Sequence, residues 1–358
     1  MGYYKLMTKP INNYSLCFSS LFHCICYVLN LYLFMKTRIL LTIGDINGIG
    51  PEIILKTINH SDLTYLYDLT VVAPLSILEY YSRLYNLKIN SSNINLIEIG
   101  GNHIKIQPGM ISKGSGLIAG FAIQSAVELC LKKKYDAIVT APISKKAVNL
   151  AGFRYDGHTE MLAALSKAKE VVMMMIHDKI SVGFASTHPP LKEVTEILSR
   201  NLLVDKISIC YDSIKRDFGI NKPRIAVLSL NPHAGEGGQI GDEEIKIIEP
   251  AMNSLKKKLK AIMDGPFPSD SYFANKTYSK YNLTFAMYHD QGMIPFKMVA
   301  GAYGVNYTAG LSFVRTSPDH GTAFDIAGKN LASEVSLIAA IKAADRIFKN
   351  RLKKTIKK

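Results

Sequence analysis

Apolar segments of strand length alternate with amphipathic segments of helix length along most of the chain, and this alternation limits the folds that the chain can adopt. The apolar run 39–43 leads through a glycine-rich turn, 44–50, into a helix that Pro51 opens. The helical stretch 116–133 in turn precedes the apolar run 137–140. Strands separated by helices favour a largely parallel sheet with helices on both faces. The sequence therefore predicts an α/β protein.

The remaining expected elements follow the same alternation. The hairpin formed by 171–176 and 180–186 is the one clear antiparallel element that the pattern predicts. Its strand 172–176 is apolar throughout and has to be covered, with a second subunit as one candidate. Further strands are expected at 69–73, 94–99, 224–230, 283–288 and 311–315, and further helices at 191–218, 242–260 and 333–349.

Size and charge narrow the class further. At 358 residues the chain exceeds one average domain, which predicts two lobes. The net charge of +14 comes largely from lysine runs at predicted helix ends and at the C-terminal tail. Such a balance attracts anionic substrates, whereas nucleic-acid binding is not expected because no basic stripe alternates with exposed aromatic residues.

The N-terminal stretch differs from the rest, because residues 10–35 contain no Lys, Arg, Asp or Glu. A signal peptide, a membrane anchor and a start codon assigned too far upstream all fit such a stretch. We favour a start at Met35, because the first strand begins a few residues later and residues 30–34 offer no small-residue cleavage site. Cys130 and Cys210 lie in predicted helices, and no CxxC pair occurs, which fits a reducing cytoplasm. Membrane association is not expected.

Three histidines each follow a predicted strand directly: His188, His233 and His289. In an open α/β sheet, ligands collect outside the carboxyl ends of the strands. Three neutral imidazoles there could fill three positions around one divalent metal. Each histidine alone is more often structural, but the three together favour a shared metal. Asp290 could orient the His289 imidazole from behind.

Other segments provide candidates for anion and nucleotide binding. The turn 44–50 is neither a Rossmann fingerprint nor a phosphate loop, and Asp45 is its one functional hint. Arg315 ends a predicted strand, where a guanidinium can hold a carboxylate or a phosphate bidentately. Lys297 could add a second positive charge or transfer a proton, and a surface salt bridge is the alternative for both residues. The loop 319–328 is rich in small residues, which allows a ligand close to the backbone, although it could simply open the last helix.

Taken together, these motifs resemble the 4-hydroxythreonine-4-phosphate dehydrogenase family of pyridoxal phosphate biosynthesis. The resemblance covers residues 38–345, and the turn 44–50 departs from it at Ile46 and Asn47, where a proline and a small residue are common. The N-terminal extension is also atypical. The matching segments are 44–53, 140–145, 157–160, 186–188, 231–237, 265–270, 288–297, Asn306 and 315–328.

The resemblance implies an isopropylmalate-dehydrogenase-like fold: two α/β/α lobes around a central cleft, in a homodimer whose active sites lie at the subunit interface. Residues 1–34 would be an extension, 35–140 with 305–358 the dinucleotide-side lobe, and 141–304 the metal, substrate and dimerisation lobe. The implied metal ligands, from both subunits, are His188, His233 and His289. The implied substrate-binding residues are His158, Thr159, Lys297, Asn306 and Arg315, and the implied dinucleotide-binding residues are His320, Gly321, Thr322 and Asp325.

The implied reaction is the NAD- or NADP-dependent oxidation of 4-phosphooxy-L-threonine, assisted by one divalent metal such as zinc, cobalt or magnesium. The resulting β-keto acid loses carbon dioxide, and Lys297, or a water held by Asp290, is the candidate base. A sister dehydrogenase acting on threonate or erythronate 4-phosphate, or on a dihydrodiol, is the first alternative. A metal-dependent hydrolase or phosphotransferase is the second, and a membrane-tethered binding protein, indicated only by residues 10–35, is the third.

Overall fold

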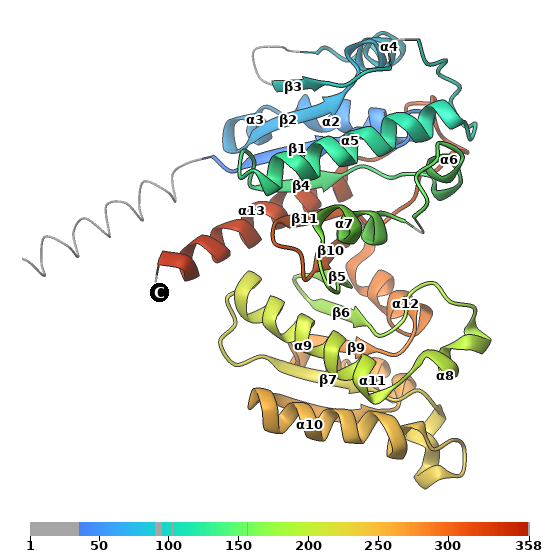
Figure 1. Cartoon of the computed structure of the whole chain (residues 1–358), viewed down its shortest axis with the longest axis vertical. Coiled ribbons are helices and arrows are strands. Elements are labelled where there is room, and N and C mark those ends of the chain that lie inside the picture. The colour runs from blue at the N-terminus through green and yellow to red at the C-terminus, as the bar shows by residue number, and fades with distance from the viewer. Residues whose placement is uncertain (1–35, 90–94, 102, 156, 357–358) are drawn as a thin grey trace, which may run out of the picture.

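One twisted sheet runs through the whole molecule (Figure 1). The computed structural model describes residues 36–356 except 90–94, 102 and 156. The expectations for residues 1–35, including the start at Met35, lie outside this part of the chain. The strand order within the described part is β3-β2-β1-β4-β11-β10-β5-β6-β9-β7-β8. The strands are β1 (Arg38–Thr42), β2 (Asp68–Ala73), β3 (Asn95–Glu98), β4 (Ala137–Thr140), β5 (Val172–His177), β6 (Ile180–Phe184), β7 (Arg224–Leu228), β8 (Ile262–Phe267), β9 (Leu283–Ala286), β10 (Val305–Ala309) and β11 (Val314–Pro318).

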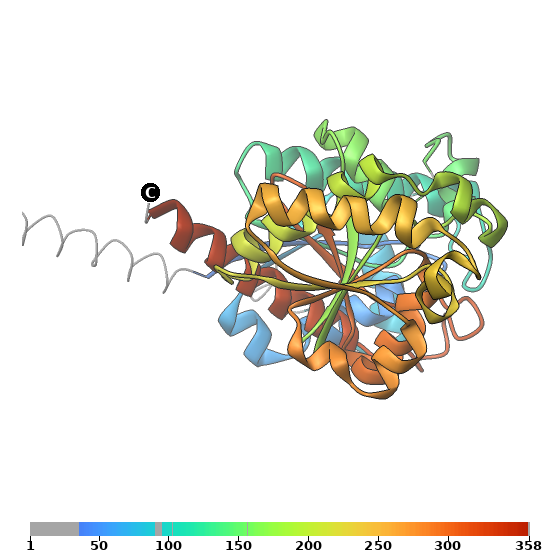
Figure 2. The ribbon, with the colours of Figure 1, turned by 90° about the horizontal axis from the view of Figure 1, so that it is seen from below.

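Helices cover both sides of the sheet, as the alternation predicted; α5 and α10 lie on one side and α11 and α12 on the other (Figure 2). The helices of the first half are α2 (Gly50–Ile58), α3 (Ser61–Leu66), α4 (Leu75–Tyr85), α5 (Lys113–Leu131), α6 (Lys145–Leu150) and α7 (His158–Ser166). Those of the second half are η1 (Leu191–Glu193), α8 (Val194–Ile197), α9 (Arg200–Asp217), η2 (Pro232–Gly238), η3 (Glu244–Ile248), α10 (Glu249–Leu259), α11 (Ser269–Ala274), η4 (Thr277–Lys280), α12 (His289–Ala300), η5 (Gly301–Tyr303) and α13 (Val335–Ile356).

The expectation of a single antiparallel element was wrong. The hairpin β5–β6 is antiparallel, but β10 also runs antiparallel to both β11 and β5. Because β10 contains Asn306 and Thr308, it lacks the continuous apolar pattern that marks the buried parallel strands. The other unpredicted strand, β8, contains Pro266, which an edge strand tolerates because one side of its backbone has no partner strand.

The apolar strand β5 is covered within the chain, so its burial requires no second subunit. It pairs with β10 on one side and β6 on the other. Met173 and Met175 join a core cluster with Phe184 and Phe296, the latter from α12.

Two helical predictions need correction. The stretch 191–218 is interrupted after α8, and Ser199 accepts a hydrogen bond from the Leu202 amide to cap α9. The last helix, α13, extends past the predicted end at 349, with Lys353 and Lys354 in its final turn, where positive charge suits the helix dipole.

Helix α5 is apolar and long enough to cross a membrane by composition and length. Within the described residues it packs against β1, β2, β4 and the neighbouring α6 and α7. A Cβ added at Gly116 would lie 1.9 Å from the Ala147 carbonyl oxygen, and one at Gly120 would lie 2.1 Å from the Phe153 ring. These glycines let α6 and its following loop approach closely, so α5 is a core helix of this fold.

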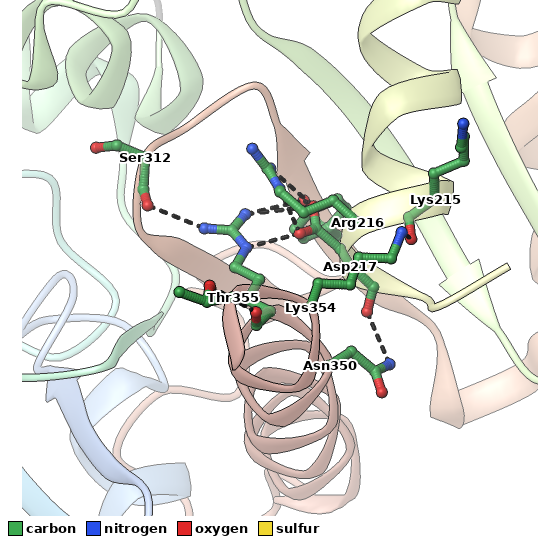
Figure 3. Close-up of polar contacts among 9 residues, drawn as sticks. Lys215, Arg216, Asp217, Ser312, Asn350, Lys354 and Thr355 are labelled. Carbon is green, nitrogen blue, oxygen red and sulfur yellow. Dashed lines mark hydrogen bonds and ion pairs between the residues drawn. The ribbon is translucent and has the colours of Figure 1, made fainter. Parts of the chain in front are cut away.

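A buried carboxylate joins α9 to α13 and β10. The side chain of Asp217 is fully buried and accepts hydrogen bonds from Arg351 Nε at 2.6 Å, from Arg216 Nε at 2.7 Å and from the Tyr307 hydroxyl. Figure 3 shows Asp217 beside Arg216, with Asn350 donating to the Asp217 backbone carbonyl. Burial raises the pKa of Asp217, but the two arginines outweigh this effect and hold the pKa below its usual value. The cluster therefore ties the C-terminal helix to the second half of the chain.

Candidate active site

The three histidines singled out in the sequence follow three neighbouring strands. The strands β6, β9 and β7 are adjacent and mutually parallel, so their carboxyl ends lie at one edge of the sheet. The strands are shorter than predicted, ending at Phe184, Ala286 and Leu228, so each histidine lies a few residues beyond its strand rather than directly after it. The predicted delivery of all three histidine-bearing segments to one sheet edge agrees with this topology.

Two of these histidines lie near each other. The ring centroids of His188 and His289 are 6.2 Å apart. His289 is the first residue of α12, and its Nδ1 lies 2.6 Å from Asp290 Oδ1. A carboxylate on one ring nitrogen leaves the other nitrogen for a ligand, which is the usual arrangement behind a metal-binding imidazole.

His233 is held separately in an unusual left-handed turn. Six consecutive residues of η2, from His233 (φ 50°) to Gly238 (φ 99°), have positive φ. The buried Glu244 side chain supports this turn by accepting hydrogen bonds from the Leu230 amide at 2.7 Å and the Asn231 amide at 2.8 Å. Among the described residues of this single chain, no three His, Cys, Asp or Glu side chains come together in a metal-binding group. One protomer thus brings together only the pair His188 and His289.

A buried glutamine links the segment that carries His289 to the segment that leads to His233. Gln291 Oε1 accepts from the Met287 amide at 2.6 Å, next to the His289 segment. Its Nε2 donates to the Ser229 carbonyl at 2.5 Å, where the chain leaves β7 toward His233, and to Ser269 Oγ at 2.9 Å. The sequence reasoning missed Gln291, whose only signal is its place two residues after His289.

A small cavity of about 170 Å³ lies over the middle of the sheet. Residues from β4, α7, β5, β10 and β11 line it, so both halves of the chain contribute. Its volume suits a metabolite of a few carbons and not a dinucleotide. Of the sequence-predicted residues, it brings together His158, Thr159, His188, Asn306, Arg315, His320 and Gly321.

Arg315 supplies a buried cation to this cavity. Its side chain is 1% exposed, and its terminal nitrogens donate to Thr140 Oγ1 at 2.7 Å and Thr308 Oγ1 at 3.1 Å. Within the described part of the chain no carboxylate forms an ion pair with it, and its Nε has no partner. Burial lowers the pKa of Arg315 to about 9, opposed by the charge of Glu160. The guanidinium is therefore still charged at neutral pH, and no carboxylate in the described part of the chain is paired with it.

Several other polar groups of the cavity have hydrogen-bonding capacity that the protein does not use. Burial, together with the charge of Arg315, lowers the pKa of His158 well below its usual value, so its ring is neutral at neutral pH. Buried polar atoms normally have hydrogen-bond partners. Five side-chain atoms of the cavity lining have none: His158 Nε2, Glu160 Oε2, Asn306 Oδ1, Arg315 Nε and His320 Nε2.

Two acidic residues of the cavity were not among the candidate residues. Glu160 appeared in the sequence only as part of a motif, and Asp319 only as the start of a loop. Burial raises the pKa of Asp319, while the charges of Lys297 and His320 lower it. Lys297 itself is exposed, and its Nζ donates to the Asp319 carbonyl at 3.3 Å, so it lies at the rim of the cavity.

The loop that follows β11 rests on the glycine-rich turn after β1. The Ile49 amide donates to the Thr322 carbonyl at 3.0 Å, and a Cβ at Gly48 would lie 2.9 Å from that oxygen. Gly44 has a φ of +73°, which a residue with a side chain rarely adopts. Beneath the turn, Asp45 is buried; burial raises the pKa of its carboxyl, and the bond from the Asn47 amide lowers it. The turn thus positions the backbone of the 320–325 loop, while Asp325 is exposed.

The fold defines an α/β protein with a small cavity, lined by residues from both halves of the chain, into which the buried Arg315 contributes a cation. The family model for the pyridoxal phosphate biosynthetic protein PdxA matches residues 56–344, and the chain belongs to this family. It is 39% identical to a 4-hydroxythreonine-4-phosphate dehydrogenase of Bacteroides thetaiotaomicron, over 88% of this chain and 90% of the relative.

The chain is also similar to a second named enzyme and to a solved structure. A D-threonate 4-phosphate dehydrogenase of Salmonella typhimurium is 38% identical, over 87% of this chain and 99% of the relative. The crystal structure of the Klebsiella pneumoniae 4-hydroxythreonine-4-phosphate dehydrogenase has a TM-score of 0.79 and 36% identity, covering 88% of this chain and 99% of that one. The predicted α/β, isopropylmalate-dehydrogenase-like fold class is confirmed.

Proposed function

We propose that this protein oxidises 4-phosphooxy-L-threonine with NAD or NADP, giving a β-keto acid that decarboxylates to 3-amino-2-oxopropyl phosphate for pyridoxine 5'-phosphate synthesis. The observation that carries the proposal is the buried Arg315, a cation to which none of the described carboxylates forms an ion pair, in a cavity of metabolite size. Relatives named for this activity, at 39% identity, support it. Arg315, Asn306, His158, Thr159 and Lys297 hold the phosphate and carboxylate ends of the substrate.

The proton of the oxidised hydroxyl group needs an acceptor near the cavity. Lys297 is the first candidate, since it lies at the rim beside Asp319; a water held by Asp290 is the second. The dinucleotide lies outside the small cavity, along the loop of His320, Gly321, Thr322 and Asp325, which the glycine-rich turn supports. The lobe of residues 35–140 and 305–358 then faces the cofactor, and residues 141–304 carry the metal ligands. The lobes meet where β10 pairs with β5.

The residues at the sheet edge fit a divalent metal. His188 and His289 offer two neighbouring imidazoles, and Asp290 orients the second. His233, which lies apart in its own chain, would complete the set from a second copy of the protein. An all-nitrogen set favours zinc or cobalt over magnesium, which prefers oxygen ligands. When bound, such a metal supplies Lewis-acid stabilisation of negative charge that develops on oxygen.

The protein acts as a homodimer, because the proposed metal site needs a histidine from a second copy. Helix α12, which begins at His289, exposes the large apolar side chains Ile294 and Met298, which are 59% and 82% exposed, and Tyr303 just after it is 61% exposed. Exposed apolar side chains that gather on one element are typical of a protein interface. The proposed dimer covers this face and places each active site at the subunit boundary. We place the protein in the cytoplasm, where its substrates and the buried thiols of Cys130 and Cys210 fit a reducing compartment.

Chelation tests the metal and the reaction together. Activity is measured by NADH or NADPH formation with 4-phosphooxy-L-threonine, before and after treatment with EDTA. We expect chelation to lower kcat by at least about 100-fold, because several kcal/mol of charge stabilisation is lost, and added zinc or cobalt to restore it. Faster turnover of D-threonate 4-phosphate would instead favour the sister dehydrogenase. Phosphate release without any nicotinamide would favour a hydrolase.

Gln291 is expected to raise the metal affinity, because its hydrogen bonds fix the backbone segments that carry His289 and His233. In Gln291→Met the three hydrogen bonds to the ends of β7, β9 and α11 are lost, and we expect cobalt affinity to fall about 10- to 100-fold. Cobalt titration followed by its visible absorption measures this. Tyr272→Phe is the matched control, since it removes a buried hydrogen bond to Thr284 in the same region but touches neither histidine segment. Equal cobalt affinity in both variants would reduce Gln291 to a general stabilising residue.

A further inference from the structure

One buried asparagine connects the glycine-rich turn after β1 to a second segment, residues 107–112, which leads into α5. The side chain of Asn47 is fully buried. Its Oδ1 accepts a hydrogen bond from the Gln107 amide at 2.8 Å. Its Nδ2 donates to the Met110 carbonyl at 2.8 Å and to Ser112 Oγ at 3.2 Å. Asn47 therefore fixes the segment 107–112 against the turn through both polar atoms of its side chain.

The segment 107–112 in turn lies against the loop that we propose for dinucleotide binding. The Gly109 amide donates to the Asn47 carbonyl at 2.8 Å, and a Cβ added at Gly109 would lie 3.0 Å from the Phe324 carbonyl oxygen. A Cβ added at Gly328 would lie 2.9 Å from a side-chain carbon of the same segment. Because the two backbones approach so closely, a shift of the segment would displace the loop.

The loop itself contains a strained residue that its neighbours have to maintain. Ala323 has a φ of 42°, in the left-handed region that residues with a side chain rarely adopt. On one side of Ala323, the Thr322 carbonyl accepts a hydrogen bond from the Ile49 amide at 3.0 Å. On the other side, the Phe324 carbonyl lies against Gly109. Backbone strain persists only where the surrounding structure maintains it, and it is concentrated at functional sites such as ligand-binding loops.

We propose that Asn47 is a positioning residue for the dinucleotide, which fixes the 320–325 loop in the conformation that binds NAD or NADP. This inference rests on the proposed function and names a residue that raises cofactor affinity without touching the cofactor. The loop offers room for a ligand, since a Cβ added at Gly321 would meet no atom of the described residues within 4 Å. A loop that is ordered before the cofactor binds loses less conformational entropy on binding, so the affinity is higher.

A purely structural role for Asn47 has to be separated from this one. Loss of buried hydrogen bonds lowers the free energy of unfolding anywhere in a protein. A fall in stability alone reduces the fraction of folded molecules, but it leaves the cofactor affinity of those molecules unchanged. The residues proposed to hold the phosphorylated substrate belong to α7, α12, β10 and β11. Cofactor affinity should therefore fall while the KM for 4-phosphooxy-L-threonine stays the same.

The experiment titrates NADH or NADPH into the intact protein and follows the fluorescence of the cofactor, which requires neither metal nor turnover. In Asn47→Ala we expect the dissociation constant to rise about 10-fold. Steady-state kinetics of the metal-loaded protein then show whether the KM for the phosphorylated substrate is unchanged. Asn59→Ala is the matched control: it removes hydrogen bonds to the Leu55 and Lys88 carbonyls in the same half of the chain and should not change the dissociation constant.

Gly109 tests the same arrangement from the other side of the loop. In Gly109→Ala the added methyl group meets the Phe324 carbonyl, and the φ of 83° adds backbone strain, so the cofactor affinity should fall as in Asn47→Ala. Gly152 has a similar φ of 97°, but a Cβ there would meet no atom of the described residues within 4 Å. Gly152→Ala therefore controls for backbone strain alone. This pair of variants decides the question if Asn47→Ala does not fold.

Three results would count against the proposal or its premise. Unchanged cofactor affinity in Asn47→Ala, or an equal loss in the control variants, overturns the proposal and leaves the dehydrogenase function intact. A rise in the KM for the phosphorylated substrate as large as the loss of cofactor affinity also overturns it, because it indicates a general distortion of the site. If the wild-type protein binds neither NADH nor NADPH and does not oxidise 4-phosphooxy-L-threonine, the proposed function itself is wrong.

Discussion

Replacement of Arg315 by methionine is expected to lower kcat/KM for the phosphorylated substrate by about 10³-fold. The guanidinium is the one buried cation that the described cavity lining offers, and a bidentate contact to an anion loses two charge-assisted hydrogen bonds in Arg315→Met. Steady-state kinetics with NADH detection measures the loss. Arg315→Lys should recover only part of it, because an ammonium cannot reproduce the fork that also reaches Thr140 and Thr308.

The same change should leave the ligand-free protein as stable as before. Burial of the uncompensated cation lowers its pKa to about 9, so the charged form costs folding free energy at neutral pH. Methionine, which is uncharged, removes that cost, and we expect the free energy of unfolding to stay within about 1 kcal/mol or to rise. Arg346→Met, which removes a surface ion pair with Asp178, serves as the control for lost charge. A collapse of stability in Arg315→Met would show that Arg315 is mainly structural.

The second large effect concerns stability alone. Asp217→Asn is expected to lower the free energy of unfolding by about 3 kcal/mol, since it leaves Arg351, 13% exposed, without its buried carboxylate. Arg216 is 42% exposed, so solvent screens its share of the interaction. Urea unfolding at pH 7 measures the difference. The exposed Asp212, replaced in the same way on the same helix, is the matched control and should change stability by no more than about 0.5 kcal/mol.

The pH dependence of that stability has a definite sign. The pKa of Asp217 is depressed in the folded protein, so its contribution is fully present above the unfolded carboxyl value, about 4, and disappears as pH falls through the folded value. Wild-type protein should therefore lose more stability than Asp217→Asn between about pH 4 and lower pH. Parallel unfolding curves for the two proteins in acid would contradict this assignment of the pKa shift.

The sequence predicted most of the parallel strands, with β8 as the exception, and local pattern explains why. β1, β2, β4 and β7 are short apolar runs between helices, and they lie within a residue or two of their expected bounds. β10 was missed because it has no continuous apolar run and its burial depends on pairing with β5, which is distant along the chain, as well as with β11. The Asp217 cluster could not be predicted from the sequence either, because its members come from α9, β10 and α13, which are far apart along the chain.

The candidate site was predictable in part. His188 and His289 were singled out by their places after strands, and Arg315 by its place at the end of one. The role of Gln291 could not be read from spacing, because it depends on two backbone contacts and one side-chain contact with segments that follow different strands. The left-handed conformation of His233 also depends on a residue outside its own motif, the buried Glu244.

The ladder between β10 and β5 limits how this enzyme can open and close. Residues Val305–Ala309 pair with Val172–Ile176 along their full length, and β10 is also bonded to β11. Because these strands join the two halves, a hinge motion that separated the halves completely would break backbone hydrogen bonds. We therefore expect the cavity to widen or narrow through a twist of the sheet around these central strands. Such a twist moves the outer strands most and β11, which carries Arg315, least.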